Sequence, residues 1–449
     1  MGSIPITRSI PQRRIHLSSR EGTRHLNSVP AGGGASSEQD PGPAAKKGFV
    51  AFRHRDFRLL IFGKLFSSLS LHMVMVVIAY QIYDLTGDPL DLAYIGLAVF
   101  APGLGFALVT GYVVDRFDRR LVLACCYLVM LISAVLFTLF ALSGTKEVWP
   151  AFMILVFYGT GRAFYMPCTN ALLPNLVPVE EFPNAVAWNT SATKLTQIAG
   201  PAIGGFLYLA GPEVVYGLAA VVFSVAVVTT AMIRTRSQRK DAEPVSLGTL
   251  LAGVRYVWGK NVVLGAISLD LFVVLAAGAT AMLPIYAKDV LDVGAWGAGL
   301  LRSAIAAGGV VTLLMLTQVA LTRDVGRIMF ACVFVFGAAT TVFGMSTWFA
   351  LSLAALAVLG AADAFSVVIR QTLIQVATPD EMRGRVSAVN AVFVSTSNEI
   401  GEVRAGFLAA WIGAVPTVVI GGIISVLITG ICWKLFPELV KLQRVDRSI

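Results

Sequence analysis

From Leu121 to Leu142 the chain reads LVLACCYLVMLISAVLFTLFAL, and none of these residues is charged. A second uncharged stretch runs from Val214 to Ile233. A helix needs about 20 mostly apolar residues to cross the roughly 30 Å hydrocarbon core of a bilayer. A soluble protein would interrupt such stretches with a polar face. The two stretches therefore predict membrane-spanning helices.

The overall composition supports the same class of protein. Of 449 residues, 56% are hydrophobic and 14% are charged, whereas soluble domains carry about 25% charged residues. The five cysteines lie in apolar segments, without the spacing of a metal site or a redox pair, and are interpreted as small hydrophobic residues. They are Cys125, Cys126, Cys168, Cys332 and Cys432. We expect no metal site and no cofactor.

Apolar stretches predict an all-α membrane protein with twelve transmembrane helices in two six-helix halves. The expected spans lie near residues 58–83, 92–114, 120–143, 149–172, 184–210, 213–234, 262–287, 297–321, 327–346, 349–373, 386–412 and 415–436. The predicted parts are an N-terminal tail (1–47), a first bundle (48–234), a linker (235–261), a second bundle (262–436) and a C-terminal tail (437–449).

The two non-bundle segments near the start and the middle have distinct compositions. Residues 1–47 lack an apolar run and are expected to be disordered. Their basic, acid-poor composition also resembles a transit peptide, and a flexible cytosolic tail or a misassigned start are alternatives. In the linker, Leu247 to Trp258 is apolar at helical spacing, which predicts a helix along the membrane surface.

Positive charge alternates between the predicted loops. Lys and Arg gather in the N-terminal tail, the linker, the C-terminal tail and three loops, while the intervening loops hold Lys146 and Lys288. The basic residues of the three loops are Arg116, Arg119, Arg120, Arg323, Arg327, Arg383 and Arg385. By the positive-inside rule both termini are expected in the cytoplasm, with the protein in the inner membrane. The net charge of +9 is thus interpreted as a topology signal and predicts no nucleic-acid partner.

A weak internal repeat relates the two halves. Pro178-Val179-Glu180-Glu181 follows the fourth predicted span, and Pro379-Asp380-Glu381 follows the tenth. Repeated halves that enclose a central site are typical of secondary transporters. Channels and membrane enzymes are also duplicated in this way, so the repeat supports transport without deciding it.

The loop after the second predicted span reads GYVVDRFDRR from Gly111 to Arg120. Gly111 allows a close approach between helices, and Asp115 is placed to pair with arginine or a helix terminus. The loop resembles the Gly-x-Leu-x-Asp-Arg-x-Gly-Arg-Arg/Lys signature of the major facilitator superfamily. Val113 stands in place of the leucine and Asp118 in place of the second glycine. The resemblance assigns a conformational role to Gly111, Asp115, Arg116, Arg119 and Arg120.

The fifth predicted span contains Gly200-Pro201-Ala202-Ile203-Gly204-Gly205. Its proline removes a backbone donor, and its glycines permit tight packing; a kinked packing helix is the alternative reading. The run resembles the Gly-Pro-x-x-Gly-Gly core of the antiporter motif in exporters of this superfamily. The extended motif has a further glycine where this chain has Thr196. The resemblance implies export by antiport and marks Gly200, Pro201, Gly204 and Gly205.

Two further segments narrow the resemblance to one branch. Thr378 to Val386, read as TPDEMRGRV, is similar to a Thr-Pro-x-x-x-Arg-Gly-Arg-Val segment. Leu250 to Tyr256 is similar to the segment that leads into the seventh span in the same branch. The branch contains the enterobactin exporter and drug–proton antiporters, and the likeness covers residues 48–436. It implies a drug or a siderophore-like cargo without naming one.

Charged residues within spans are costly, at about 2.5–3.5 kcal/mol each on insertion scales, and mark functional sites. In the first half they are Lys64, Arg162 and Lys194. Lys64 is near enough to a span end to reach the headgroups. Two polar stripes at helical spacing predict the wall of a substrate cavity, with an interhelical clamp to a carboxylate as the alternative for the two cations. The stripes are Tyr158, Arg162 and Tyr165, and Thr190, Lys194 and Gln197. His72 is interpreted as a pore-lining or packing residue.

Carboxylates dominate the second half. A carboxyl group partly withdrawn from water holds a proton more readily, and a nearby arginine opposes this. This combination suits proton coupling, with structural ion pairs as the alternative. The proton-coupling candidates are Glu399, Asp363, Asp270 and Glu402, and the ion-pair candidates are Arg302, Arg370 and Arg404. Asp363 shares a helix face with Arg370, and Asn398 shares one with Glu402.

The sequence thus favours a secondary active transporter, not an enzyme. It would export a small amphipathic or anionic molecule, drug-like or siderophore-like, across the inner membrane by proton antiport with alternating access. A proton-coupled or facilitative importer of a nutrient is the first alternative. A non-transporting sensor or a multispan enzyme is the second. The expected partners are a small-molecule substrate, protons and the lipid bilayer, and the chain is expected to act as a monomer.

Overall fold

The computed structural model describes residues 47–235, 254–318 and 324–443, and those from Gly48 onward form one compact unit. Within these ranges the regular structure is helical, and no strand occurs there. Residues 1–46 of the predicted tail (1–47) and most of the predicted linker lie outside the described residues, including 247–253 of the expected surface helix. The described residues confirm the all-helical class.

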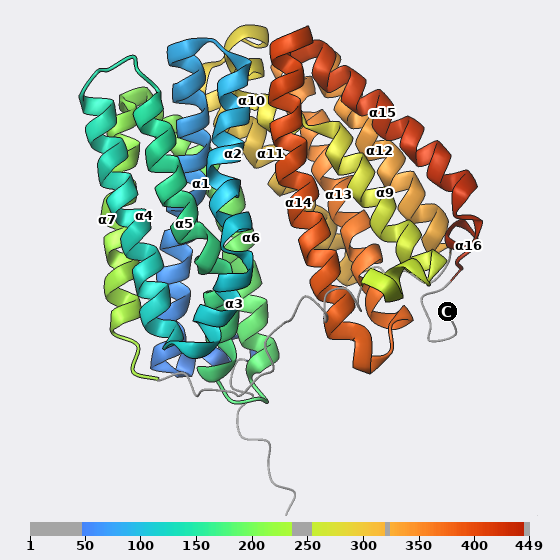
Figure 1. The fold of residues 1–449 in the computed structure, drawn as a ribbon, viewed down its shortest axis with the longest axis horizontal. Coiled ribbons are helices and arrows are strands. Elements are labelled where there is room, and N and C mark those ends of the chain that lie inside the picture. The colour runs from blue at the N-terminus through green and yellow to red at the C-terminus, as the bar shows by residue number, and fades with distance from the viewer. Residues whose placement is uncertain (1–46, 236–253, 319–323, 444–449) are drawn as a thin grey trace, which may run out of the picture. The chain divides into compact units, whose positions relative to one another are not determined.

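Seven helices from α1 to α7 form a first group that packs mainly on itself (Figure 1). α4 packs against α5 and α7, α1 against α6 and α7, and α2 against α5. A short 3₁₀ helix, η1 (Lys47–Arg53), precedes them. The helices are α1 (Arg55–Thr86), α2 (Pro89–Gly105), α3 (Ala107–Arg116), α4 (Arg119–Leu142), α5 (Trp149–Leu172), α6 (Phe182–Leu207) and α7 (Pro212–Ala231).

The helices from α9 onward form a second group (Figure 1). α11 packs against α13, α12 against α13 and α15, and α9 against α14 and α15. The elements are α9 (Asn261–Ala277), η4 (Ala279–Met282), α10 (Leu283–Ile285), the π-helical η5 (Tyr286–Val290), α11 (Gly294–Gln318), α12 (Val325–Met345), α13 (Phe349–Ala377), α14 (Asp380–Ile412), α15 (Ala414–Leu435) and α16 (Pro437–Val440). The predicted C-terminal tail thus begins as a packed turn, because Leu439 and Val440 are buried.

Eight helices of the described chain are long and apolar enough to cross a membrane. α2 and α3 raise the number to nine if they are one span, because they meet at a 58° bend. Pro102 lies just before that bend, and proline inside a helix is a common cause of a kink. A multi-pass membrane protein is therefore confirmed, whereas the count of twelve spans stays a prediction.

The helices place the basic loops at one end of the molecule, which we call the basic end. The α3–α4 connection and the starts of α6 and α14 lie there, at the bottom of Figure 1. The two repeated segments form similar turns at this end. Glu181 N donates to Pro178 O at 3.1 Å, and Met382 N donates to Pro379 O at 3.0 Å. The other end, here the opposite end, carries the α1–α2 and η5–α11 connections.

Candidate functional site

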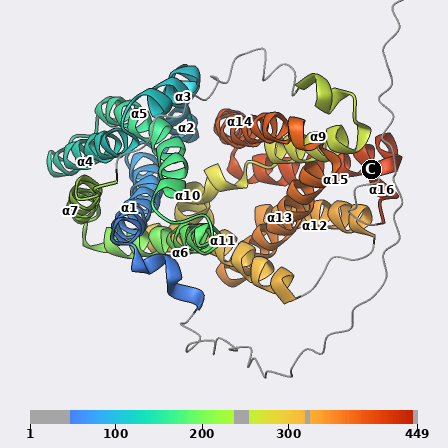
Figure 2. The same cartoon turned by 90° about the horizontal axis from the view of Figure 1, so that it is seen from below.

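A cavity of about 680 Å³ lies between the two helix groups. Its wall comes from α1 and α6 of the first group and from α9, η4 and α11–α14 of the second. α6 and α11 lie side by side, as Figure 2 also shows from below. The polar part of the wall consists of His72, Thr190, Lys194, Gln197, Thr280, Arg302, Asp363, Gln371, Asn398 and Glu402. Both groups thus contribute charged side chains to one cavity.

The α6 stripe that the sequence marked does line this cavity. Thr190, Lys194 and Gln197 all belong to its wall. Lys194 Nζ donates to Gln197 Oε1 at 3.3 Å, one helical turn away. The helical spacing that grouped these residues therefore also orients them toward the space between the groups.

The α5 stripe is placed differently. Tyr158 and Tyr165 are buried in the first group, where their rings contact Phe223 and Tyr127, and neither lines the cavity. Arg162 lies on the same stripe, and its longer side chain reaches α14. Its Nη2 is 3.4 Å from Glu399 Oε1. For Arg162 the contact seen is the interhelical clamp with a carboxylate that was the alternative to a cavity role.

The second-group carboxylates fall into two environments. Asp363 and Glu402 line the cavity. Glu402 Oε1 is 3.7 Å from Arg302 Nη1 on α11. Arg404, the other candidate partner, instead donates to Ala276 O at 2.5 Å. Glu402 therefore forms an ion pair with another helix, α11.

Asp270 is buried and forms an ion pair with Arg370, across α9 and α13. Asp363 and Arg370 share a helix face but do not form an ion pair, because Arg370 pairs with Asp270 instead. A void of about 10 Å³ is lined by both Asp270 and Asp363, together with Ser366. A cavity of that size is close to the minimum that holds one water molecule.

Lys64 and His72 lie on α1, facing α6. Lys64 is buried, and its Nζ donates to Asn189 Oδ1 at 2.6 Å, so it does not extend toward the headgroups. His72 lines the cavity, and its Nδ1 is 2.7 Å from Ser68 O. The contact between Lys64 and Asn189 was not predicted from the sequence, because these residues are 125 positions apart.

The signature loop is tied to the first helix group. Asp115 is 3.5 Å from Arg119, which also donates to Ala171 O at 3.0 Å. Arg116 lies over the ring of Tyr112 at 5.5 Å. The expected close approach at Gly111 is wrong for this arrangement: a Cβ added there would meet no described heavy atom within 4 Å.

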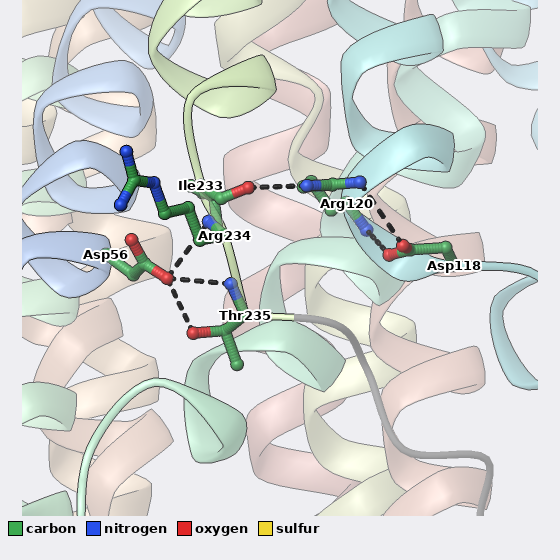
Figure 3. A network of polar contacts seen from close by, with 6 residues as sticks. All are labelled: Asp56, Asp118, Arg120, Ile233, Arg234 and Thr235. Carbon is green, nitrogen blue, oxygen red and sulfur yellow. Dashed lines mark hydrogen bonds and ion pairs between the residues drawn. The ribbon is translucent and has the colours of Figure 1, made fainter.

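Figure 3 shows how the end of α7 is fixed at the basic end. Arg120 donates to Ile233 O at 2.6 Å and is 3.6 Å from Asp118, whose side chain caps α4. Asp56, in the first turn of α1, accepts hydrogen bonds from the backbone of Arg234 and Thr235 at 3.1 and 2.8 Å. The segment after α7 is thus bonded to both α1 and α4.

The glycines of the fifth predicted span do mediate close packing. A Cβ added at Gly200 would be 2.6 Å from His72 Cβ, and one at Gly204 would be 3.0 Å from Met73 Cα, both on α1. At Gly205 it would be 2.6 Å from Ala295 O on α11. Hence one helix, α6, contacts its own group and the second group through glycine.

Charged residues also join the groups at the opposite end, and we call this set the outer latch. Lys288 Nζ is 2.7 Å from Asp84 Oδ1, and Tyr83 donates to Asp289. From the sequence, Lys288 was identified only as a basic loop residue, and neither Asp84 nor Asp289 was predicted to be functional. The pairing of residues about 200 positions apart leaves no local signal.

Comparison with known proteins agrees with this architecture. The family model described as transmembrane secretion effector, of the major facilitator type, matches residues 46–447. Macrolide efflux protein A of Streptococcus pyogenes is 22% identical over 86% of this chain and 96% of its own length. Enterobactin exporter EntS of Escherichia coli O1:K1 is 26% identical over 88% of this chain and 94% of its own.

Solved structures share the fold at low identity. A D-xylose–proton symporter superposes with a TM-score of 0.63 at 16% identity, over 86% of this chain and 98% of that one. A mutant of the nucleoside transporter NupG gives 0.65 at 14% identity, over 85% and 100%. With the match of the family model over nearly the whole described chain, these likenesses place the protein: it belongs to the transmembrane secretion effector family of the major facilitator superfamily.

Proposed function

We propose that this protein is a twelve-span exporter that moves a small amphipathic molecule out of the cytoplasm by proton antiport. The observation that carries the proposal is the 680 Å³ cavity whose charged wall comes from both helix groups. A site shared by two groups is what alternating access requires, since movement of one group against the other changes its exposure. The names of the two relatives, an efflux protein and an exporter, support the outward direction.

The contacts between the groups support a state that is closed at the opposite end. The outer latch, the contact of Gly205 with Ala295 and the Arg162–Glu399 pair lie from the middle of the molecule toward that end. The positive-inside rule assigns the basic end, and both termini, to the cytoplasm. The described arrangement is then the inward-facing state, which takes up cargo from the cytoplasm across the inner membrane.

For proton coupling we assign the first role to Asp363. It lines the cavity, has no ion-pair partner among the described residues, and shares a water-sized void with Asp270. A proton that enters from the outside would neutralise Asp363 and release the cargo there. Glu399 pairs with Arg162 of the first group, so it is assigned to holding the groups together. Glu402 pairs with Arg302 within the second group and is assigned to a structural ion pair there.

The coupling is tested in inside-out membrane vesicles with labelled erythromycin and enterobactin as first probes. We expect an acid-inside gradient to drive accumulation of at least one probe, and nigericin to abolish it. Asp363→Asn should leave accumulation the same with and without the gradient, because the amide carries no titratable proton. Glu147→Gln, in the exposed α4–α5 loop, is the matched control. Wild-type accumulation that ignores the gradient would contradict proton antiport.

The outer latch gives a second test of alternating access. Lys288→Asp would place a third carboxylate beside Asp84 and Asp289, and like charges at this distance repel. We expect slower transport. We also expect a thiol reagent that reaches the protein only from the opposite end to label a cysteine placed at Gln197 faster, since that end should close less often. The reversed pair, Asp84→Lys with Lys288→Asp, should recover much of the rate. Equal labelling of wild type and Lys288→Asp would count against a gate at this end.

A further inference from the structure

Two side chains of opposite charge face the cavity without an ion pair in the described part of the chain. Lys194 on α6 has Gln197 as its polar partner, at 3.3 Å. The carboxylate of Asp363 on α13 accepts no hydrogen bond from a described residue, although it lies within the electrostatic influence of Asp270, Arg370 and Lys194. The other charged pair of the wall, Arg302 and Glu402, is mutually satisfied at 3.7 Å.

Unpaired charges in a cavity of this kind favour a ligand that completes them. Lys194 and Asp363 are both half-buried, so neither is fully hydrated. A charge that loses water without gaining a partner costs free energy. A ligand with one charge of either sign would satisfy one side chain and leave the other unpaired. A ligand with both charges would satisfy both.

The rest of the wall selects for an apolar body. Ile305, Phe336, Leu359 and Val367 of the second group line the same cavity as Asp363. The volume of about 680 Å³ falls within the usual range of roughly 300–1,000 Å³ for sites of drug-sized ligands. Besides the Arg302–Glu402 pair, the cavity therefore combines one cation and one anion without an ion pair among the described residues with an apolar surface.

We propose that the cargo is an amphipathic zwitterion whose amine binds Asp363 and whose acidic group binds Lys194. This proposal rests on the transport function above and narrows its cargo. It replaces the anionic option, because Arg162, the second cation that favoured an anion, is paired with Glu399. The zwitterionic headgroup of phosphatidylethanolamine offers the same two charges, so the test must separate a solute from a lipid.

The test uses one rigid scaffold in three charge forms. Norfloxacin is zwitterionic at neutral pH, its ethyl ester is a cation, and its N-acetyl derivative is an anion. Binding of each is measured with the full-length protein in nanodiscs of phosphatidylglycerol. We expect norfloxacin to bind about 10- to 100-fold more tightly than either derivative, the range for one hydrogen bond to a charged group.

Two cavity variants make the prediction specific. In Lys194→Met, norfloxacin and its ester should bind equally, because the carboxylate has lost its partner. In Asp363→Asn, norfloxacin and its N-acetyl derivative should bind equally, because the amine has lost its partner. Lys194→Arg should keep the preference for the zwitterion, which guards against a variant that merely misfolds. Lys146→Met, in the exposed α4–α5 loop, should match wild type.

Equal binding of the three forms to wild type, no binding of any of them, or a preference that survives both variants would overturn the zwitterion proposal. Norfloxacin binding that disappears when phosphatidylethanolamine is added to the discs would assign the site to a lipid headgroup and overturn a solute cargo. These failures are distinct from failure of the exporter function. In that case no probe would be moved by a pH gradient in vesicles, whatever its charge.

Discussion

Gly205→Val is expected to reduce transport to a small fraction of the wild-type rate without preventing insertion. A Cβ at this position would lie 2.6 Å from Ala295 O and 3.1 Å from the Cα atoms of Trp296 and Gly299, all backbone atoms of α11. Backbone cannot rotate away as a flexible side chain can. Overpacking of this kind costs about 1–3 kcal/mol, which lowers the population of the described arrangement roughly 5- to 150-fold.

The matched control is Gly217→Val, within α7, where an added Cβ meets no heavy atom within 4 Å. It introduces the same side chain into a helix of the same group and should transport like wild type. The measurement is gradient-driven uptake in inside-out vesicles, with the amount of folded protein checked by size-exclusion chromatography. If the two variants transport equally, the α6–α11 contact is not part of the transport cycle.

The second large effect is expected on stability, at the buried pair of Asp270 and Arg370. Their side chains are 9% and 2% exposed. Arg370→Met leaves the carboxylate of Asp270 buried and unpaired, and removing one partner of a buried pair typically costs about 3–5 kcal/mol. We therefore expect a clear fall in the temperature of thermal unfolding in detergent.

Comparing Arg370→Met with Arg302→Met separates the effect of burying an ion pair from the effect of removing a positive charge. The Arg302–Glu402 pair has side chains that are 41% and 34% exposed to the cavity. Pairs of that exposure contribute about 0–1 kcal/mol, so Arg302→Met should unfold close to wild type. Asp270→Asn combined with Arg370→Met removes both charges and should recover part of the loss. Identical unfolding temperatures for Arg370→Met and Arg302→Met would show that burial of the pair adds nothing.

Much of the helix map was predictable from hydropathy and charge. Predicted spans such as 120–143 and 149–172 differ from α4 and α5 by a residue at each end or less. The break between α2 and α3 was not predicted, although Pro102 precedes it, because proline alone does not tell a kinked span from a straight one. Hydropathy reports how a segment partitions into lipid, and the bend depends on what packs around it.

The sequence predicted which site residues share a face of one helix, but not which residues on other helices they contact. Helical spacing grouped Thr190, Lys194 and Gln197, and all three line the cavity. The same rule grouped Tyr158 with Arg162, yet the tyrosine is buried in the first group. Spacing identifies residues on a shared face, but the neighbour of that face depends on how the helices pack. Arg370 is an example, since its partner lies on α9, 100 positions away.

Helices α6 and α14, which contribute Lys194 and Glu402 to the cavity, are poorly suited to enter a membrane alone, and so is α5, which carries Arg162. α5, α6 and α14 have 24, 26 and 33 residues, yet none meets the combined requirement of apolarity and low charge that eight other helices meet. A segment of this kind enters the bilayer favourably when a neighbour already covers its polar groups. For α6 that neighbour is α1, whose Lys64 and Ser68 bond to Asn189 and Thr196. Biogenesis of this protein should therefore depend on order: α1 must still be held near the translocon when α6 emerges from the ribosome.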